Sequence, residues 1–459
     1  MSASKTEEAE ATNGAAGWTA GLTAAAIPER VLARAQDLLL DTLGVAVGAA
    51  RTPAAAIAYD FAADHFAARP GGDTARLPFD GRATGIPGAA WALATRIDNL
   101  DAHDGFQPVK GHAGVVLVAT LLALVQSTRG TVSGRDALAA LVAGYEVASR
   151  AGLTLHHTAA DYHSSGAWNA LGAAALGARL QLPDDAAATA HALGIAEYHA
   201  PRAPMMREID QPSMLHDSSG WGAMAGVTGV LLAARGFAAS RAALTAGEAW
   251  DDLGTRWLVE EQYTKPHPVC FWAQPAVRAA LALRERHKLG ASDIAGVRVE
   301  TFHEATRLAT GVPPTTAAAQ YALAFPVACA LARGRVGPDE IAGSGLSDAT
   351  VATLTARIEA SERVAFSARF PAERTAEVVI TTADGTRLRS GPHQPHGVPD
   401  SPLTRGAIET KFREYTADIL SPEATAAITA AVLRLHEPDA TLATLLEACL
   451  APAPAAERG

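Results

Sequence analysis

Residues 101–112 concentrate side chains that can transfer protons. The segment reads DAHDGFQPVKGH and holds two carboxylates, two imidazoles and one amine, those of Asp101, Asp104, His103, His112 and Lys110. Carboxyl and imidazole groups are well suited to proton transfer near neutral pH. The internal Gly and Pro residues favour a loop, and the run VVLVATLLALV after it favours a buried helix too short to cross a membrane. Because helix N-termini favour anions, the segment predicts an enzyme that acts on a carboxylate. The alternative is a polar loop whose Asp and His groups only satisfy one another.

Two later segments repeat this design of a histidine-bearing polar loop before a helix rich in small residues. The segment DYHSSG, residues 161–166, carries His163, and LHDSSG, residues 215–220, carries His216. If the three helix ends converge, they form a pocket for a multiply charged carboxylate. A helix N-terminus also disfavours imidazolium, so these histidines would stay neutral and act as bases. The plainer alternative is that Ser164 and its neighbours only cap helices and that the histidines are structural.

The segment YTKPHPVC, residues 263–270, is a further candidate. Its prolines hold the chain extended, so that Lys265 and His267 project together at a predicted domain junction. There Lys265 would pair with a substrate carboxylate and His267 would assist, unless the segment is only a rigid hinge. Arg207 could hold a carboxylate through two hydrogen bonds, although a solvated surface arginine is the plainer reading.

Metal and nucleotide sites are weighed and set aside. Asp101, His103, Asp104 and His112 are possible metal ligands, but their spacing matches no established ligand signature. The Gly-rich stretches match neither a P-loop nor a well-placed dinucleotide fingerprint. We therefore expect no cofactor and no metal.

Composition indicates a globular protein rather than a nucleic-acid binder. The chain has 459 residues, 49% hydrophobic and 19% charged, and a net charge of −10. The three cysteines are far apart, which argues against a disulfide framework or a zinc ribbon. The N-terminal residues 1–17 are polar, acidic and Ala-rich, without the basic start and apolar core of a secretory signal, so we expect a cytoplasmic protein.

The helix and strand patterns predict a mainly α protein: a large all-helical domain with a second, smaller α+β lid domain. Apolar residues at three- and four-residue spacing predict helices over most of residues 24–269. After Pro268 the pattern changes, and GVRVETF, RVAFSARF and AEVVITTADGTRLRS predict strands, the last a hairpin about residues 383–385. We expect the helical domain over residues 18–272 plus 403–449, the lid over 273–402, and disordered tails over 1–17 and 450–459.

Across residues 24–449 the chain resembles the MmgE/PrpD family. The resemblance rests on the order and spacing of LLLDTLGVAVGAA, LDAHDGFQPVKGHAG, GYEVASRAG, DYHSSGAWNALGAAALGARLQL, HDSSGWGAMAGVTGVLLAARGFAAS, KPHPVC and SPLTRGAIETKFREY. The family includes 2-methylcitrate dehydratase, cis-aconitate decarboxylase and iminodisuccinate epimerase. The resemblance implies a cofactor-free homodimer of two-domain subunits with the site between the domains. It also implies that Asp101, Asp104, His112 and His163 line this site and that Lys265 belongs to a Lys-Pro motif.

Two positions depart from the family pattern. His216 stands where many members carry a Lys, which replaces a permanent charge with a titratable one. Phe325 stands where an active-site Tyr is common, and Tyr321, one helical turn earlier, is a possible substitute.

The favoured hypothesis is a lyase that removes the proton alpha to a carboxylate of a small di- or tricarboxylic acid and then eliminates water. His112 or His163 would be the base, Lys265 and the helix ends would stabilise the enediolate, and Asp101 and Asp104 would orient the imidazoles. The candidate catalytic residues are Asp101, Asp104, His112, His163, His216 and Lys265. The candidate substrate-binding residues are His103, Lys110, Ser164, Arg207, His267 and Tyr321. Epimerisation between opposed carriers such as His112 and His216, decarboxylation, and a weakened homologue that only binds carboxylates remain as alternatives.

Overall fold

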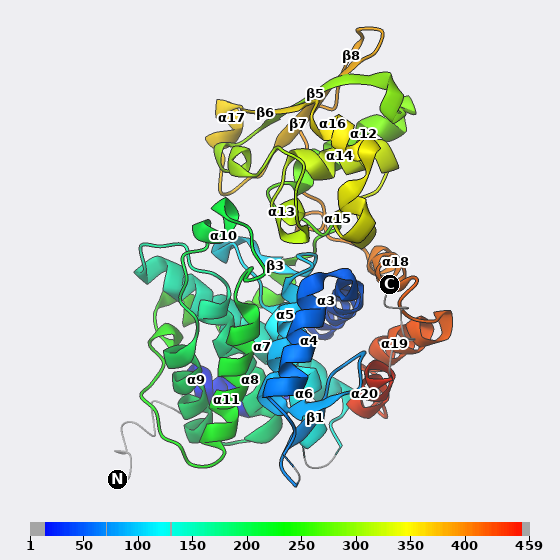
Figure 1. Ribbon diagram of the computed structural model, residues 1–459. Coiled ribbons are helices and arrows are strands. Elements are labelled where there is room, and N and C mark those ends of the chain that lie inside the picture. The colour runs from blue at the N-terminus through cyan, green and yellow to red at the C-terminus, as the bar shows by residue number, and fades with distance from the viewer. Residues whose placement is uncertain (1–13, 70, 129–130, 452–459) are drawn as a thin grey trace.

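The fold divides into a larger helical domain and a smaller domain that contains a sheet (Figure 1). The computed structural model describes residues 14–69, 71–128 and 131–451. The predicted fold class, a mainly helical chain with a smaller α+β part, is confirmed. Among the described residues, no helix has both the length and the apolar character needed to cross a bilayer.

The helices of the larger domain coincide with the periodic segments of the sequence. They are α2 Ala15–Gly21, α3 Glu29–Gly48, α4 Pro53–His65, α5 Ile86–Asp98, α6 Gly114–Leu124, α7 Gly134–Thr158, α8 Gly166–Gln181, α9 Ala186–His199, α10 Met206–Asp210 and α11 Ser219–Ala233. Hydroxyl caps mark several starts, as where Ser133 accepts a hydrogen bond from the Asp136 N–H at the start of α7. Helix α6, the run VVLVATLLALV, is buried on every side, as its uniformly apolar sequence requires.

Small residues let these helices pack closely. Helix α11 lies against α8, and a Cβ added at Gly226 would fall 2.7 Å from the Ala170 carbonyl oxygen and 2.9 Å from the Ala174 nitrogen. No side chain fits there without moving one of the helices. The Ala- and Gly-rich composition thus sets the spacing of the helices whose ends form the site.

Two short antiparallel ribbons join loops of the larger domain. Strand β1 (Thr74–Arg76) pairs with β2 (Ala83–Gly85), and β3 (Gly105–Phe106) pairs with β4 (Gln262–Tyr263). The second ribbon connects the polar loop 101–112 to the segment that leads into the smaller domain.

The smaller domain packs helices against a four-stranded mixed sheet. Its helices are α12 Gln274–His287, α13 Thr316–Gln320, α14 Ala324–Arg333, α15 Pro338–Ile341, α16 Ala349–Thr355 and α17 Val364–Ser367. Its strands are β5 Ile294–Thr301, β6 Ile358–Glu362, β7 Ala376–Thr382 and β8 Arg387–Arg389. The strand order is β6-β5-β7-β8, with β5 parallel to β6 and the other pairs antiparallel.

Two of the three strand predictions in this domain are confirmed and one is wrong. The segment GVRVETF, residues 296–302, coincides with β5 except for its last residue. Strands β7 and β8 form the predicted hairpin, with Gly385 at a φ of 86° in its turn. The predicted strand at residues 363–370 is instead the short helix α17 and a turn. The strand beside β5 lies just before it, at Ile358–Glu362, and the apolar Val364 is 76% exposed.

The last helices return to the larger domain. They are α18 Arg405–Thr416, α19 Pro422–Arg434 and α20 Leu442–Leu450, and α18 packs on α3. The buried Lys411 of α18 donates hydrogen bonds of 2.7 Å each to the Asp41 carboxylate and to the carbonyls of Ala102 and Lys265. One ammonium group therefore joins three segments that lie far apart in sequence.

The N-terminal end of the described chain is helical rather than a loose tail. Most of the tails predicted over residues 1–17 and 450–459 lies outside the described residues, but Ala15–Gly21 forms helix α2 with buried alanines.

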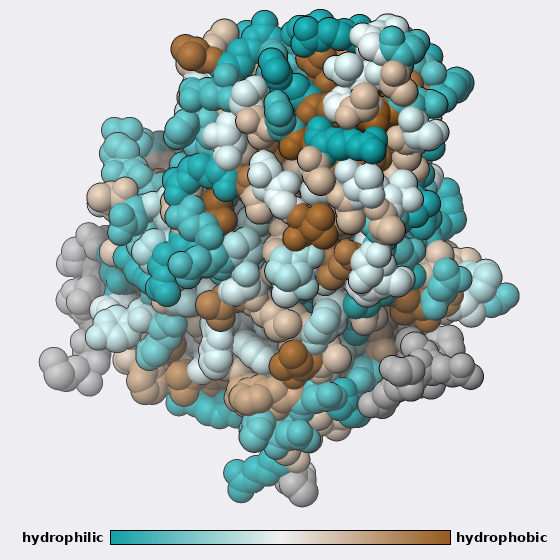
Figure 2. Space-filling model, turned by 45° about the horizontal axis from the view of Figure 1, so that its top comes forward, coloured by the Kyte–Doolittle hydropathy of each residue, from teal (hydrophilic) through white to brown (hydrophobic). Residues whose placement is uncertain are grey.

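On the face shown in Figure 2, hydrophobic residues occur in small groups between hydrophilic ones.

Candidate active site

A small cavity of about 40 Å³ lies where the two domains meet. The lining residues come from the loop 101–112, from Tyr162, from the segment 205–217 before α11, from the segment 263–272 and from the smaller domain. Its polar lining groups belong to Asp101, Lys110, His112, Tyr162, Asp217, Tyr263, Lys265, Cys270, Tyr321 and Arg374.

The loop 101–112 is folded tightly enough to present several of these groups together. Asp101 and Lys110 both have left-handed backbone conformations, with φ values of 52° and 53°. The Phe106 N–H donates to the Gly111 carbonyl across the loop at 2.8 Å. Unfavourable conformations of non-glycine residues often occur at functional sites, where the surrounding structure holds them in place.

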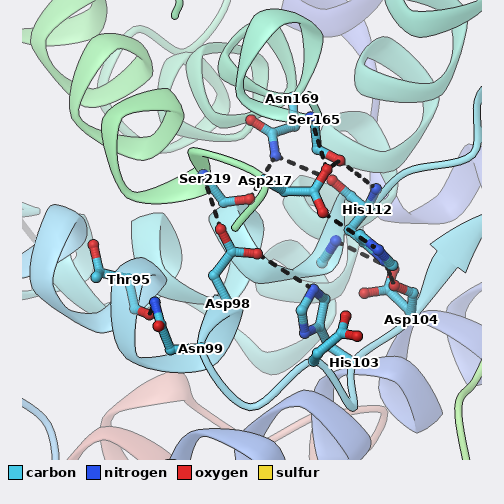
Figure 3. Close-up of polar contacts among 12 residues, drawn as sticks. Thr95, Asp98, Asn99, His103, Asp104, His112, Ser165, Asn169, Asp217 and Ser219 are labelled. Carbon is cyan, nitrogen blue, oxygen red and sulfur yellow. Dashed lines mark hydrogen bonds and ion pairs between the residues drawn. The ribbon is translucent and has the colours of Figure 1, made fainter. Parts of the chain in front are cut away.

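His112 is held so that one ring nitrogen is available to the cavity (Figure 3). Its Nδ1 lies 2.5 Å from the Asp104 carbonyl oxygen. Because a carbonyl oxygen can only accept, Nδ1 carries the proton and Nε2 keeps its lone pair. Burial lowers the pKa of His112, and the nearby Lys265 lowers it further. A neutral imidazole with a free Nε2 is a general base.

Asp217 lies beside that free nitrogen. Its Oδ2 is 3.8 Å from His112 Nε2, while its Oδ1 accepts hydrogen bonds from the Ser165 N–H and hydroxyl at 3.0 and 2.5 Å. The Ser165 hydroxyl in turn accepts a hydrogen bond from the main-chain N–H of His112 at 2.9 Å. Asp217 is therefore fixed where it can stabilise an imidazolium formed at His112.

A second histidine and carboxylate lie directly behind the first pair (Figure 3). The His103 ring packs edge-on against His112 with 4.6 Å between ring centroids, and its Nε2 is 3.8 Å from Asp98 Oδ1. The other oxygen of Asp98 accepts from the Ser219 N–H at 3.1 Å, at the first residue of α11. Burial raises the pKa of Asp98 well above its usual range and lowers that of His103 well below its usual range. This pair supports the His112 ring from behind and ties it to α11.

Lys265 supplies a buried positive charge on the cavity wall. Its ammonium group donates to the Asp101 carboxylate and, at 3.1 Å, to the Asp101 carbonyl. Lys265 is 1% exposed and Asp101 is 3% exposed. Such a pair can stabilise negative charge that develops on a bound substrate.

Proton donors flank the same cavity. The phenols of Tyr162, Tyr263 and Tyr321 are protonated at neutral pH, and burial raises their pKa well above its usual value. The His216 ring lies 5.6 Å from the Tyr321 ring, centroid to centroid, and burial lowers its pKa to about 4. Neutral His216 therefore lies beside Tyr321, which lines the cavity.

Gly105 is required by the closeness of these groups. A Cβ added there would press directly on the Tyr263 phenol and fall 2.9 Å from His112 Nδ1. We expect Gly105→Ala to lower the free energy of unfolding by ~1–3 kcal/mol through overpacking. Turnover should also fall, by roughly tenfold or more, since both rings are displaced. Chemical denaturation and steady-state kinetics would measure both effects. Gly406→Ala, at a position with open space around it, is the matched control.

The structure brings some of the predicted residues together and leaves others apart. Those that line the cavity are Asp101, Lys110, His112, Lys265 and Tyr321. His103, Asp104, Ser164 and His216 are buried nearby without lining it. Phe325 is buried in the core and does not line the cavity. Tyr321, the possible substitute for a tyrosine at that position, does line it.

Three predicted residues lie elsewhere. His163 does not line the cavity: its Nδ1 is 2.7 Å from the Asp161 carbonyl oxygen. Arg207 is exposed on α10, and His267 turns its Nδ1 toward the Val336 carbonyl oxygen at 3.0 Å. The expected gathering of three imidazoles is thus reduced to His112 and His216.

The expected orienting carboxylates also need correction. Asp101 pairs with Lys265 rather than with an imidazole. Asp104 orients His112 through its carbonyl oxygen, while its carboxylate accepts from the Gly114 N–H at 3.2 Å. Burial raises the pKa of the Asp104 carboxyl to about 7.

Sequence reasoning missed Asp217, Tyr162, Tyr263 and Arg374. Asp217 and Tyr162 are each next to a histidine that drew attention, and Tyr263 opens the quoted segment YTKPHPVC. No motif in the sequence pointed to Arg374, because this residue lies in the smaller domain just before β7 and far from the other site residues in the chain.

In residues 14–69, 71–128 and 131–451, no group of three or more His, Cys, Asp or Glu side chains is placed to hold a metal ion.

Comparisons with known families agree with this two-part architecture. The chain matches the model of the MmgE/PrpD N-terminal domain over residues 14–256 and that of the MmgE/PrpD C-terminal domain over residues 267–437. A search of curated proteins gave no match.

Proposed function

The chain belongs to the MmgE/PrpD family, which consists largely of enzymes, and on this premise we propose that it is a cofactor-independent hydro-lyase. Its substrate is a small di- or tricarboxylic acid with a proton alpha to a carboxylate and a hydroxyl on the next carbon. The observation that carries the proposal is the free Nε2 of His112 beside Asp217, in a cavity that also contains the Lys265 ammonium.

In the first step, His112 Nε2 takes the alpha proton. The bonding electrons move into the substrate carboxylate and give an enediolate. Lys265 stabilises this added charge, and Asp217 stabilises the imidazolium at a starting distance of 3.8 Å. The fixed Nδ1 hydrogen bond to Asp104 keeps the ring aimed during transfer.

In the second step, the carbon–oxygen bond of the hydroxyl breaks. The enediolate electrons form the carbon–carbon double bond, and the leaving oxygen takes a proton and departs as water. Tyr321 is our candidate for this acid, because its buried phenol holds its proton at neutral pH and lines the cavity.

Domain boundaries and subunit association belong to the same proposal. We propose that residues 273–402 act as a lid on the helical domain of residues 18–272 and 403–449, and that two chains form a homodimer. Phe61, Trp91 and Trp221 form a ring cluster whose outer members are 41% and 50% exposed, and a second chain would cover them.

The test is proton exchange in D₂O over a panel of hydroxy and imino polycarboxylic acids, followed by NMR. Deuterium uptake at the alpha carbon with formation of an alkene supports dehydration. Uptake with inversion and no loss of water indicates epimerisation, and release of carbon dioxide indicates decarboxylation. Binding of these acids without any exchange would contradict the proposal and favour a homologue that only binds.

The pH dependence of turnover should follow His112. Only the unprotonated base can abstract a proton, and burial lowers its pKa from 6.5. We therefore expect kcat/KM to rise with pH along a limb that lies below pH 6.5 and to be level above it. Asp217→Asn removes a charge that raises this pKa, so its limb should move to lower pH and its plateau should fall. A limb above pH 6.5, or one that Asp217→Asn does not move, would assign the base elsewhere.

A further inference from the structure

Two cations lie at the lid side of the cavity without a carboxylate partner. Arg374 and Lys110 both line the cavity, and neither forms an ion pair within 4.0 Å in the part of the chain that the structure describes. The other charged groups of the cavity are engaged, since Lys265 pairs with Asp101 and Asp217 faces His112. Neither cation is therefore neutralised by an ion pair in the described part of the chain.

Arg374 is held in a fixed orientation by aromatic rings. It is 2% exposed, and its guanidinium carbon lies 5.3 Å from the Phe271 ring centroid and 5.6 Å from that of Phe370. Phe271 itself stacks on Tyr263, with 3.9 Å between centroids and 14° between planes. The guanidinium is thus placed by the same segment that carries Lys265.

The hydrogen bonds of this guanidinium are incomplete. Nη1 donates to the Pro371 carbonyl at 3.2 Å, and the buried Nε has no partner. An arginine has five N–H donors in a flat fork that matches a carboxylate. Arg374 is at the same time one of the residues that line the cavity.

The lid segment that carries Arg374 is docked on the loop of His112. Gln107, within that loop, donates to the carbonyls of Ala372 and Pro371 at 2.8 and 3.3 Å. Pro371 therefore accepts hydrogen bonds from both the loop and Arg374. The contact joins the loop that carries His112 to the segment that carries Arg374.

Lys110 completes the cationic end. Its ammonium group lies 4.7 Å from the centroid of the Tyr162 ring. Burial lowers the pKa of Lys110, and the charge of Arg374 lowers it further. The charge of Glu304 raises the pKa of both Lys110 and Arg374. Among the described residues, however, Glu304 forms no ion pair with either cation.

We propose that Arg374 and Lys110 bind a second carboxylate of the substrate. Burying an unpaired cation is costly unless a counter-ion is supplied, and a ligand carboxylate supplies it. The inference deepens the proposed function and relies on it for the reacting end of the substrate. It requires a substrate with at least two carboxylates, one activated beside Lys265 and one held by the lid.

The experiment measures binding without turnover, by calorimetric titration with tricarballylate, a tricarboxylate that has no leaving hydroxyl. Arg374→Gln should weaken tricarballylate binding by about tenfold or more, since charge-assisted hydrogen bonds of a paired carboxylate are lost. Lys110→Gln should also weaken it, by less. Arg369→Gln is the matched control, because Arg369 lies in the same segment, is half exposed and pairs with Glu373 at 3.1 Å.

A structural role for Arg374 predicts different results. If the arginine only stabilised the fold, Arg374→Gln would lower the melting temperature of the ligand-free protein and leave the Kd within about twofold, which would overturn the inference. We expect the ligand-free melting temperature to be unchanged or higher, because an unpaired buried charge is removed. If Arg374→Gln does not fold, Arg374→Lys decides: weaker tricarballylate binding supports the inference, and unchanged binding overturns it.

The two proposals fail separately. Alpha-proton exchange with an unchanged Kd in Arg374→Gln would leave the lyase proposal standing and remove the lid subsite. If Arg374→Gln loses tricarballylate binding but the wild type shows no alpha-proton exchange, the lid subsite stands and the lyase proposal fails.

Discussion

His112→Gln is expected to lower kcat by roughly a hundredfold or more and to leave the fold intact. A glutamine amide can still donate a hydrogen bond to the Asp104 carbonyl, but it cannot accept a proton at neutral pH. The Ser165 contact is made by the main-chain N–H of residue 112, so it survives the substitution. The lower kcat should therefore reflect slower proton transfer and not a failure of the site to assemble.

The measurement is the alpha-proton exchange rate together with kcat, with circular dichroism as the check on folding. His163→Gln is the matched comparison, since that ring interacts with the Asp161 carbonyl and does not line the cavity. We expect a much smaller loss there. A His163→Gln variant as slow as His112→Gln would show that the structure assigns the base wrongly.

Lys265→Met is expected to have the largest effect on stability, about 3–5 kcal/mol, and to abolish measurable turnover. The substitution leaves the Asp101 carboxylate buried at 3% exposure without its cation. Breaking one side of a buried ion pair costs far more than replacing both sides, because a lone charge remains away from water.

A double substitution separates stability from catalysis. Lys265→Met with Asp101→Asn removes both charges, so most of the lost free energy of unfolding should return, while turnover stays low. Urea denaturation of the wild type, the two single variants and the double variant measures the coupling. Additive losses in the double variant, or recovered turnover, would contradict the role given to this pair.

The fold was accessible from the sequence because its signals are local. The periodic apolar runs of α3, α7 and α8 and the hairpin of β7 and β8 each depend on residues close in the chain. The error at residues 363–370 has a tertiary cause. Apolar alternation there resembles a strand, but β5 pairs with the preceding segment 358–362.

The site was accessible only in part, because side-chain direction is not a local property. His163 and His216 share the same sequence surroundings, yet His216 contacts Tyr321 at the cavity and His163 faces a carbonyl outside it. The importance of Asp217 depends on Ser165, which the fold brings from another helix. Arg374 reaches the cavity only through the docking of the two domains, which no spacing in the sequence encodes.

The three hydrogen bonds of Lys411 have a consequence for synthesis of the protein. A ribosome makes the loop 101–112 and the segment around Lys265 long before it makes residue 411. Until then the Asp41 carboxylate and the carbonyls of Ala102 and Lys265 lack the donor that joins them. A chain that ends before α18 lacks the Lys411 ammonium, so we expect this site to be completed only after residue 411 has been made.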